Sequence, residues 1–250
     1  MKTLIFGATG GTGRELVAQA LAQGHVVTAF ARDPAKVRVK HENLRVVRGD
    51  MLDENAVAQA VAGQDAVLSA LGVRLPAWKF AATIIVAPFV LRFAKIRPPV
   101  SDYVWVAIVI LAALFFFRRT TLLSTGTRHI VGAMERQGVR RFVCESSLGV
   151  GDSRGRLGIL ANAVAIPLML RNVFADKEVQ ERIIRESGLE WVIVRPAILT
   201  NGPRTGRYRA GPGIGHWFFP SKISRADVAD FMLQQLTSDA YLRQSPGMAY

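Results

Sequence analysis

Three glycines near the beginning of the chain constrain its fold more than any other feature. Gly7, Gly10 and Gly13 follow a short apolar segment, residues 2–6, and precede a segment whose apolar residues recur at helical spacing. A chain that turns tightly after a strand and leaves bare backbone at the start of a helix can hold a pyrophosphate. The free N–H groups and the helix dipole attract that anion. The pattern therefore predicts a dinucleotide-binding site made of a strand, a glycine loop and a helix.

Strands and helices alternate along most of the chain. We expect strands at residues 2–6, 25–31, 44–47, 66–70, 141–145 and 191–194. We expect helices after the glycine loop, ending at Gly24, and at residues 54–62, 127–137, 175–186 and 226–236. This alternation predicts βαβ units and an α/β fold, a Rossmann-type doubly wound parallel sheet that occupies residues 1–250 as a single NAD(P)-binding domain.

The end of the second expected strand indicates which dinucleotide binds. Proteins that bind NAD usually carry a carboxylate there for the ribose 2′-hydroxyl, and that carboxylate would repel a 2′-phosphate. Here Arg32 offers a guanidinium suited to phosphate, and we expect Asp33 to cap the turn before Pro34. The expected cofactor is therefore NADP(H), with NAD(H) as the alternative because of Asp33.

Further cofactor-binding candidates lie in the glycine loop and directly after the expected strands. Asp50 and Met51 would flank the adenine, and residues after the fourth strand would lie near the nicotinamide ribose. The full set from this reasoning is Gly7, Thr9, Gly10, Gly11, Thr12, Gly13, Arg32, Asp50, Met51, Ala70, Leu71 and Gly72.

The composition excludes several other classes of protein. Half of the residues are apolar, so the chain can bury a sizeable core. A net charge of +13 favours anionic ligands, but the basic residues are spread out and no nucleic-acid-binding module is recognisable. One cysteine, Cys144, and four scattered histidines give no metal site. We expect no secretory signal and a cytoplasmic location.

Residues 78–119 interrupt the alternation and are too apolar for a surface loop. Residues 103–117 are fifteen consecutive apolar residues, and residues 80–94 are nearly as apolar. We interpret the segment as a hydrophobic hairpin inserted after the fourth strand. A fifteen-residue helix spans about 22 Å, short of the roughly 30 Å hydrocarbon core of a bilayer. A membrane-docking or re-entrant hairpin on the cytoplasmic side, a two-pass anchor, and an apolar lid or dimerisation arm are the alternatives, with residues 80–117 as the membrane contact.

Four stretches of the chain resemble the atypical short-chain dehydrogenase/reductases, in particular the NmrA-like group and the biliverdin-IXβ (flavin) reductase type. They are FGATGGTGRELVAQAL, GDMLDENAVAQAVAGQDAVLSALG, GTRHIVGAMERQGVRRFVCESS, and the region from RESGLEWVIVRPAIL to KISRADVADFML. The resemblance covers the chain except for the inserted segment and the ends. It implies an open parallel sheet that binds NADP(H), and reductase chemistry on a flavin, quinone or tetrapyrrole-like acceptor.

The resemblance also implies roles for individual residues. The glycine loop would hold the pyrophosphate, and Arg32 would hold the 2′-phosphate. Ser147 corresponds to a serine that orients substrate or a proton-relaying water, although a simple hydrogen bond at the strand end is the alternative. Other matches on the cofactor side are Gly72, Arg74, Ser146, Pro196, Ala197 and Ile198.

One departure from the wider short-chain family concerns catalysis. The Tyr-x-x-x-Lys pair is absent, because Lys177 follows Phe174 and no tyrosine stands at the required spacing. By resemblance to NmrA-like reductases, Lys177 is the candidate proton donor; an ion pair with Glu181 or a contact with the cofactor ribose are the alternatives. A flavin-type acceptor needs no protein acid, since solvent can supply the proton.

Three functions remain open from the sequence. The first is an NADPH-dependent reductase that transfers hydride to a flavin, quinone or similar conjugated small-molecule acceptor. The second is a redox-sensing regulator that binds NADP without catalysis. The third is a membrane-associated assembly factor that uses the nucleotide-binding fold as a scaffold.

Overall fold

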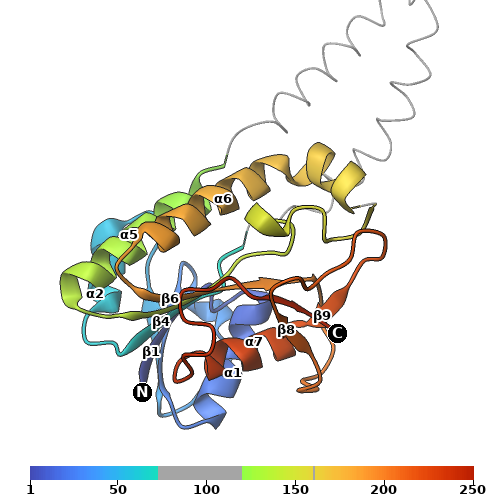
Figure 1. Ribbon diagram of the computed structural model, residues 1–250. Helices are drawn as coiled ribbons and strands as arrows, with labels where there is room; N and C mark the ends of the chain where they lie inside the picture. The colour runs from blue at the N-terminus through green and yellow to red at the C-terminus, as the bar shows by residue number, and fades with distance from the viewer. Residues whose placement is uncertain (73–119, 160) are drawn as a thin grey trace, which may run out of the picture.

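The computed structural model describes residues 1–72, 120–159 and 161–250. A central sheet is covered by helices on both faces (Figure 1). Within these residues, eight strands form the main sheet in the order β3-β2-β1-β4-β5-β6-β10-β8. The strands from β3 to β10 are parallel along that order, and only β8 runs antiparallel to its neighbour. The predicted Rossmann-type doubly wound sheet is confirmed.

The strand bounds agree closely with the expected segments in the first part of the chain. The main sheet contains β1 (Lys2–Phe6), β2 (Val26–Ala31), β3 (Leu44–Arg48), β4 (Ala66–Ser69), β5 (Arg141–Glu145), β6 (Glu190–Pro196), β8 (Arg209–Gly211) and β10 (Gly247–Ala249). A separate pair is formed by β7 (Ile198–Thr200) and β9 (Lys222–Ser224). We did not expect β7 to β10, because a strand of three residues is too short to show an apolar period.

The core is divided between the two faces of the sheet, as the alternation of side chains along a strand requires. In β1, Ile5 belongs to the cluster under one helix layer, whereas Leu4 and Phe6 belong to the other. One layer consists of α1 (Gly11–Ala22) and α7 (Arg225–Gln234), and the other of α2 (Glu54–Val61), α5 (Leu122–Gln137) and α6 (Arg171–Glu186) (Figure 1). Both faces are thus buried, as is typical of a parallel sheet.

Helix α5 begins at Leu122, five residues before its expected start. The carboxylate of Asp176, on α6, accepts hydrogen bonds from the N–H groups of Leu123 (2.9 Å) and Ser124 (3.1 Å). This cap comes from a distant part of the chain, so no local pattern reveals it. The predicted end is confirmed, since Gly138 has a φ of 70° and closes the helix.

The expected hairpin at residues 78–119 lies outside the described residues. In the part of the chain that the structure does describe, no helix is long and apolar enough to cross a membrane. A π-helix, η3 (Ala161–Leu170), lies directly before α6.

Candidate cofactor site

The glycine loop has the tight geometry that a pyrophosphate requires. Gly7 adopts a φ of 77°, and a Cβ on it would lie 2.4 Å from the carbonyl oxygen of Ala70. A Cβ on Gly13 would lie 2.0 Å from the carbonyl oxygen of Gly7 and 2.9 Å from the Cα of Ala8. These neighbours are backbone atoms that cannot move aside. Any other residue at either position would therefore push the helix away from the strand.

The start of α1 is open to an anion. Gly10 occupies the N-cap position, and no described side chain caps it. The N–H of Gly10 itself is satisfied by the carbonyl of Gly7 at 2.8 Å. The first-turn N–H groups and the positive end of the helix dipole are thus available to a phosphate. A bare cradle of this kind fits the pyrophosphate of a dinucleotide.

The end of β2 carries the features expected of an NADP(H) site. Asp33 accepts a hydrogen bond from the N–H of Ala35 (3.2 Å) and pairs with Lys36 (3.0 Å), so the predicted cap before Pro34 is confirmed. The hydrogen bond from Lys36 lowers the pKa of Asp33. Arg32 is exposed and forms no ion pair with any described residue. Its guanidinium therefore remains available for a ligand.

Arg48 is a second cation at this edge that the sequence analysis missed. Ala31 and Arg48 are register partners at the carboxyl ends of β2 and β3. Parallel pairing therefore places Arg48 at the end of β2, where its charge adds to the effect of Lys36 in lowering the pKa of Asp33, although fifteen positions separate Asp33 from Arg48 along the chain. Knowing the strand register would have revealed it.

The other expected cofactor residues follow neighbouring strands at the same edge of the sheet. Asp50 accepts a hydrogen bond from the N–H of Leu52 (3.0 Å) and so shapes the turn after β3. Met51 is buried against Gly126 of α5. The backbone of Ala70 packs against Gly7, and Gly72 is exposed beyond it. Thr9 lies in the turn between β1 and α1, Gly11 is the first residue of α1, and Leu71 directly precedes Gly72, whereas Arg74 falls outside the described residues.

A buried polar group connects the glycine loop to β5. The hydroxyl of Thr12 donates a hydrogen bond to Glu145 at 3.0 Å, and both side chains are buried. Lys177 of α6 is buried beside this carboxylate. Burial raises the pKa of Glu145 and lowers the pKa of Lys177, and in each case the charge of the other residue opposes the shift. A lysine of lowered pKa next to the cofactor cradle suits proton transfer.

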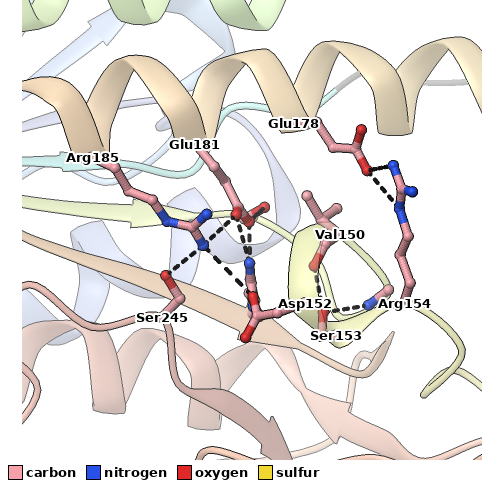
Figure 2. A network of polar contacts seen from close by, with 11 residues as sticks. Val150, Asp152, Ser153, Arg154, Glu178, Glu181, Arg185 and Ser245 are labelled. Atoms are coloured by element: carbon pink, nitrogen blue, oxygen red, sulfur yellow. Dashed lines mark hydrogen bonds and ion pairs between the residues drawn. The ribbon is translucent and has the colours of Figure 1, made fainter.

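Lys177 and Glu181 are not ion-paired within the described residues. The Glu181 carboxylate instead binds Arg195 through two hydrogen bonds (3.0 and 2.7 Å), and it also accepts hydrogen bonds from Ser146 (2.6 Å) and Arg185 (3.1 Å). Figure 2 shows Glu181 and Arg185 directed from the same helix toward this cluster. Glu181 therefore pairs with Arg195, and the ion pair between Lys177 and Glu181 that the sequence offered as an alternative is not formed among the described residues.

The two serines after β5 have different surroundings. The hydroxyl of Ser146 is buried on Glu181, which fixes the end of β5 to α6. Ser147 is half-buried, and its hydroxyl donates to the carbonyl of Leu148 at 3.0 Å. That contact matches the expectation of a hydrogen bond at the strand end, and a role toward substrate stays a prediction.

The segment after β6 approaches the same edge of the sheet. The carbonyl of Pro196 accepts a hydrogen bond from the N–H of Leu148 (2.9 Å), which joins the ends of β5 and β6. Ala197 is buried and hydrogen-bonded to Met248, whereas Ile198 is 41% exposed. Ile198 is therefore the member of this expected trio that offers a side chain to a ligand.

Arg225 lies against the glycine loop, and its position was not predictable from the sequence. A Cβ on Gly11 would lie 2.4 Å from the Cδ and 2.5 Å from the Nε of Arg225. The positive charge of Arg225 favours the ionised form of the buried Glu145 carboxylate, and its guanidinium donates a hydrogen bond to the side-chain oxygen of Asn201 at 2.5 Å. Packing of α7 on α1 brings it there, 214 positions after Gly11 in the chain. A guanidinium over the loop can bind the same anion as the helix terminus.

The described residues contain no group of three or more histidine, cysteine or acidic side chains that could hold a metal ion. The candidate site therefore consists of a glycine cradle, three arginines and a buried lysine–carboxylate pair. The glycine loop, Arg32, Arg48 and Glu145 lie at the carboxyl ends of strands β1, β2, β3 and β5, where ligands bind in doubly wound sheets, and Lys177 and Arg225 come from helices α6 and α7.

Comparisons with known proteins agree with this geometry. A family model described as NAD(P)H-binding matches residues 7–239. An uncharacterized chloroplastic protein of Arabidopsis thaliana is 28% identical over 244 residues, which cover 95% of this chain and 72% of that protein. The 3-diazoavenalumate denitrifying reductase of a Streptomyces species is 29% identical over 216 residues, 84% of this chain and 60% of the reductase. This chain thus matches less than two-thirds of the reductase.

Solved structures support the fold. ChuY, an anaerobillin reductase from Escherichia coli O157:H7, superposes with a TM-score of 0.70 at 22% identity, covering 100% of this chain and 97% of that one. A short-chain dehydrogenase/reductase from Veillonella parvula in complex with NADP gives 0.69 at 18% identity, covering 100% and 94%. At these identities the likeness establishes the architecture alone.

Proposed function

Because the chain belongs to the NAD(P)H-binding family, we propose that it is an NADP(H)-dependent reductase. Its substrate would be a flavin, quinone or tetrapyrrole-like acceptor with a conjugated ring system. The observation that carries the cofactor assignment is the end of β2. There the Asp33 carboxylate is engaged by Lys36 and Ala35, while the Arg32 guanidinium is exposed and without an ion pair among the described residues.

The residues of the glycine loop would bind the cofactor. The uncapped N-terminus of α1 and the guanidinium of Arg225 support a pyrophosphate there, and Arg32 with Arg48 supports a 2′-phosphate. When bound, NADPH supplies a hydride; the acceptor takes up that hydride and one proton, and NADP⁺ and the reduced acceptor leave.

Lys177 is our candidate for the proton donor. Burial lowers its pKa, so its ammonium gives up a proton more readily than an exposed lysine does. Glu145 would keep the ammonium beside the cofactor cradle, and Thr12 holds Glu145 in place at 3.0 Å. Solvent would then return the proton to Lys177 between turnovers.

The acceptor class is supported by the relatives and by the missing tyrosine. Two similar proteins have reductase in their names, one acting on 3-diazoavenalumate and one on anaerobillin. A tyrosine acid serves ketone reduction in the wider short-chain family and is absent here, whereas a conjugated acceptor can take its proton from another donor such as Lys177 or from solvent.

Turnover with a panel of acceptors tests the proposal. Purified protein is mixed with NADPH and, in turn, FMN, a short-chain quinone and biliverdin, and loss of the nicotinamide absorbance is followed. We expect turnover with at least one acceptor and none with the matched Gly13→Ala variant, whose Cβ would collide with Gly7. NADPH binding without turnover on any acceptor would overturn the reductase proposal.

A redox sensor that binds NADP without catalysis is the second candidate function. The observation that favours it is the position four residues before Lys177, where Val173 stands in place of the family tyrosine. Tight NADPH binding in the turnover assay, with no oxidation, is the result that would support it. The membrane contact of residues 80–117 stays a separate prediction from the sequence.

A further inference from the structure

A basic cavity lies at the β6–β10–β8 end of the sheet, separate from the glycine loop. Its volume is about 510 Å³. It is open to solvent and is lined by the loop containing η2 (Gly151–Ser153), the C-terminal end of α6, strand β6 and the segments that flank β8 and β10. Cavities of this size hold small organic ligands in other proteins.

Four arginines and one carboxylate line this cavity. Arg195 is 1% exposed, and its guanidinium donates hydrogen bonds to the carboxylates of Asp152 (2.6 Å) and Glu181. Glu181 itself does not line the cavity. Arg185 donates to Glu181 and to Ser245, each at 3.1 Å, as Figure 2 shows. The two carboxylates therefore balance these two arginines.

The other two arginines give the cavity an excess of positive charge. Arg156 and Arg243 line it, and neither forms an ion pair within the described part of the chain. Asp152, the carboxylate of the lining, is already paired with Arg195. Two guanidinium groups that line one open cavity with no ion pair to a described residue attract an anion, because each presents a fork of donors that matches carboxylate or phosphate oxygens.

Arg243 is held in an unfavourable backbone conformation at the cavity wall. Its φ is 56°, and it is the only non-glycine residue with a positive φ among the described residues. The N–H of Arg243 donates to the carbonyl of Trp191 at 2.8 Å, which fixes this geometry. A side chain in the left-handed region is strained, and such strain concentrates at functional sites. Glycine would relieve the strain but would remove the guanidinium.

We propose that this cavity is a second ligand site, which binds a small organic anion. The anionic group, a carboxylate or a phosphate, would lie between Arg156 and Arg243. Leu148, Trp191 and Ile214 supply apolar walls for the remainder of the ligand. The occupant is therefore an amphipathic small molecule and not an inorganic ion.

Calorimetric binding of three probes tests the proposal. Phenylacetate and phenyl phosphate carry the two candidate anionic groups on the same apolar ring, and phenylacetamide is the neutral counterpart. We expect at least one of the two anions to bind and phenylacetamide to bind at least about tenfold more weakly. The preference between the two anions identifies the group that the site recognises. Equal binding of the anions and the amide, or no binding of any probe, would overturn the proposal.

Variants locate the bound anion. Arg156→Gln combined with Arg243→Gly should weaken binding of the preferred anion at least about tenfold. The matched control is Arg182→Gln, an exposed arginine on α6 outside the cavity, and it should leave the affinity unchanged. Thermal denaturation checks that the double variant folds, which we expect because glycine suits the backbone at position 243. An affinity that the double variant leaves unchanged would place the anion elsewhere, for instance at the glycine loop, and would refute the assignment.

Discussion

Removal of the Glu181 charge should destabilise this fold strongly, because Arg195 is buried with it. Their side chains are only 2% and 1% exposed, and two hydrogen bonds of 3.0 and 2.7 Å join them. In Glu181→Gln the amide keeps the shape but loses the charge, so the Arg195 guanidinium remains buried with Asp152 as its carboxylate partner. Removing one member of a buried ion pair costs about 3–5 kcal/mol. For a chain of this length the corresponding fall in Tm is roughly 6–20 °C.

The same helix provides a matched control for this prediction. Glu178 pairs with Arg154, whose side chain is 71% exposed, so solvent screens the interaction. Glu178→Gln should therefore cost less than about 1 kcal/mol. Urea denaturation followed by circular dichroism measures both variants against the unchanged protein. Equal losses of unfolding free energy in the two variants would refute the argument that burial decides the contribution of these pairs.

Two further predictions concern the candidate site, and a third concerns the burial of Cys144. Gly13→Ala should lower NADPH affinity at least about tenfold, because its Cβ would lie 2.0 Å from the Gly7 carbonyl oxygen. The control Gly188→Ala should leave the affinity unchanged, because a Cβ there meets nothing within 4 Å. Equal NADPH affinities of the two variants would contradict the assignment of the glycine loop as the pyrophosphate site. If Lys177 donates the proton, kcat/KM should fall as the pH rises through its pKa, which burial lowers below the usual value of about 10.4. Lys177→Met should abolish this step and reduce kcat at least about a hundredfold, and an unchanged pH profile would indicate solvent as the donor. Burial raises the pKa of Cys144 to about 12, so iodoacetamide at about pH 8 should leave this thiol unmodified in the folded protein. In urea the same reagent should alkylate Cys144 fully. Rapid alkylation without urea would contradict the burial of Cys144.

The parts of the fold that were predictable are those governed by local patterns. Gly7, Gly10 and Gly13 sit where the backbone itself demands glycine, and the apolar residues of β1, β2, β4, β5 and β6 report burial in a sheet. The Asp33 cap is also local, because it depends on neighbouring residues alone. These features identify the cofactor cradle and its edge of the sheet.

The parts that were not predictable depend on contacts between distant residues. Glu145 and the Glu181–Arg195 pair are charged residues whose burial depends on the element that packs against them, and Arg225 reaches the glycine loop because α7 packs on α1. Their neighbours in the sequence do not distinguish them from exposed charges. The early start of α5 has the same origin, since its cap, Asp176, comes from α6.

Equilibrium binding of NADPH and NADH tests the central claim most directly. Charge-assisted hydrogen bonds from Arg32 to a 2′-phosphate should contribute about 1.5–3 kcal/mol, which corresponds to a preference for NADPH of roughly 10- to 150-fold. The Arg32→Ala variant should bind NADPH more weakly and NADH with unchanged affinity, so that most of the preference for NADPH is lost. Tighter binding of NADH than of NADPH, or no binding of either nucleotide, would contradict it.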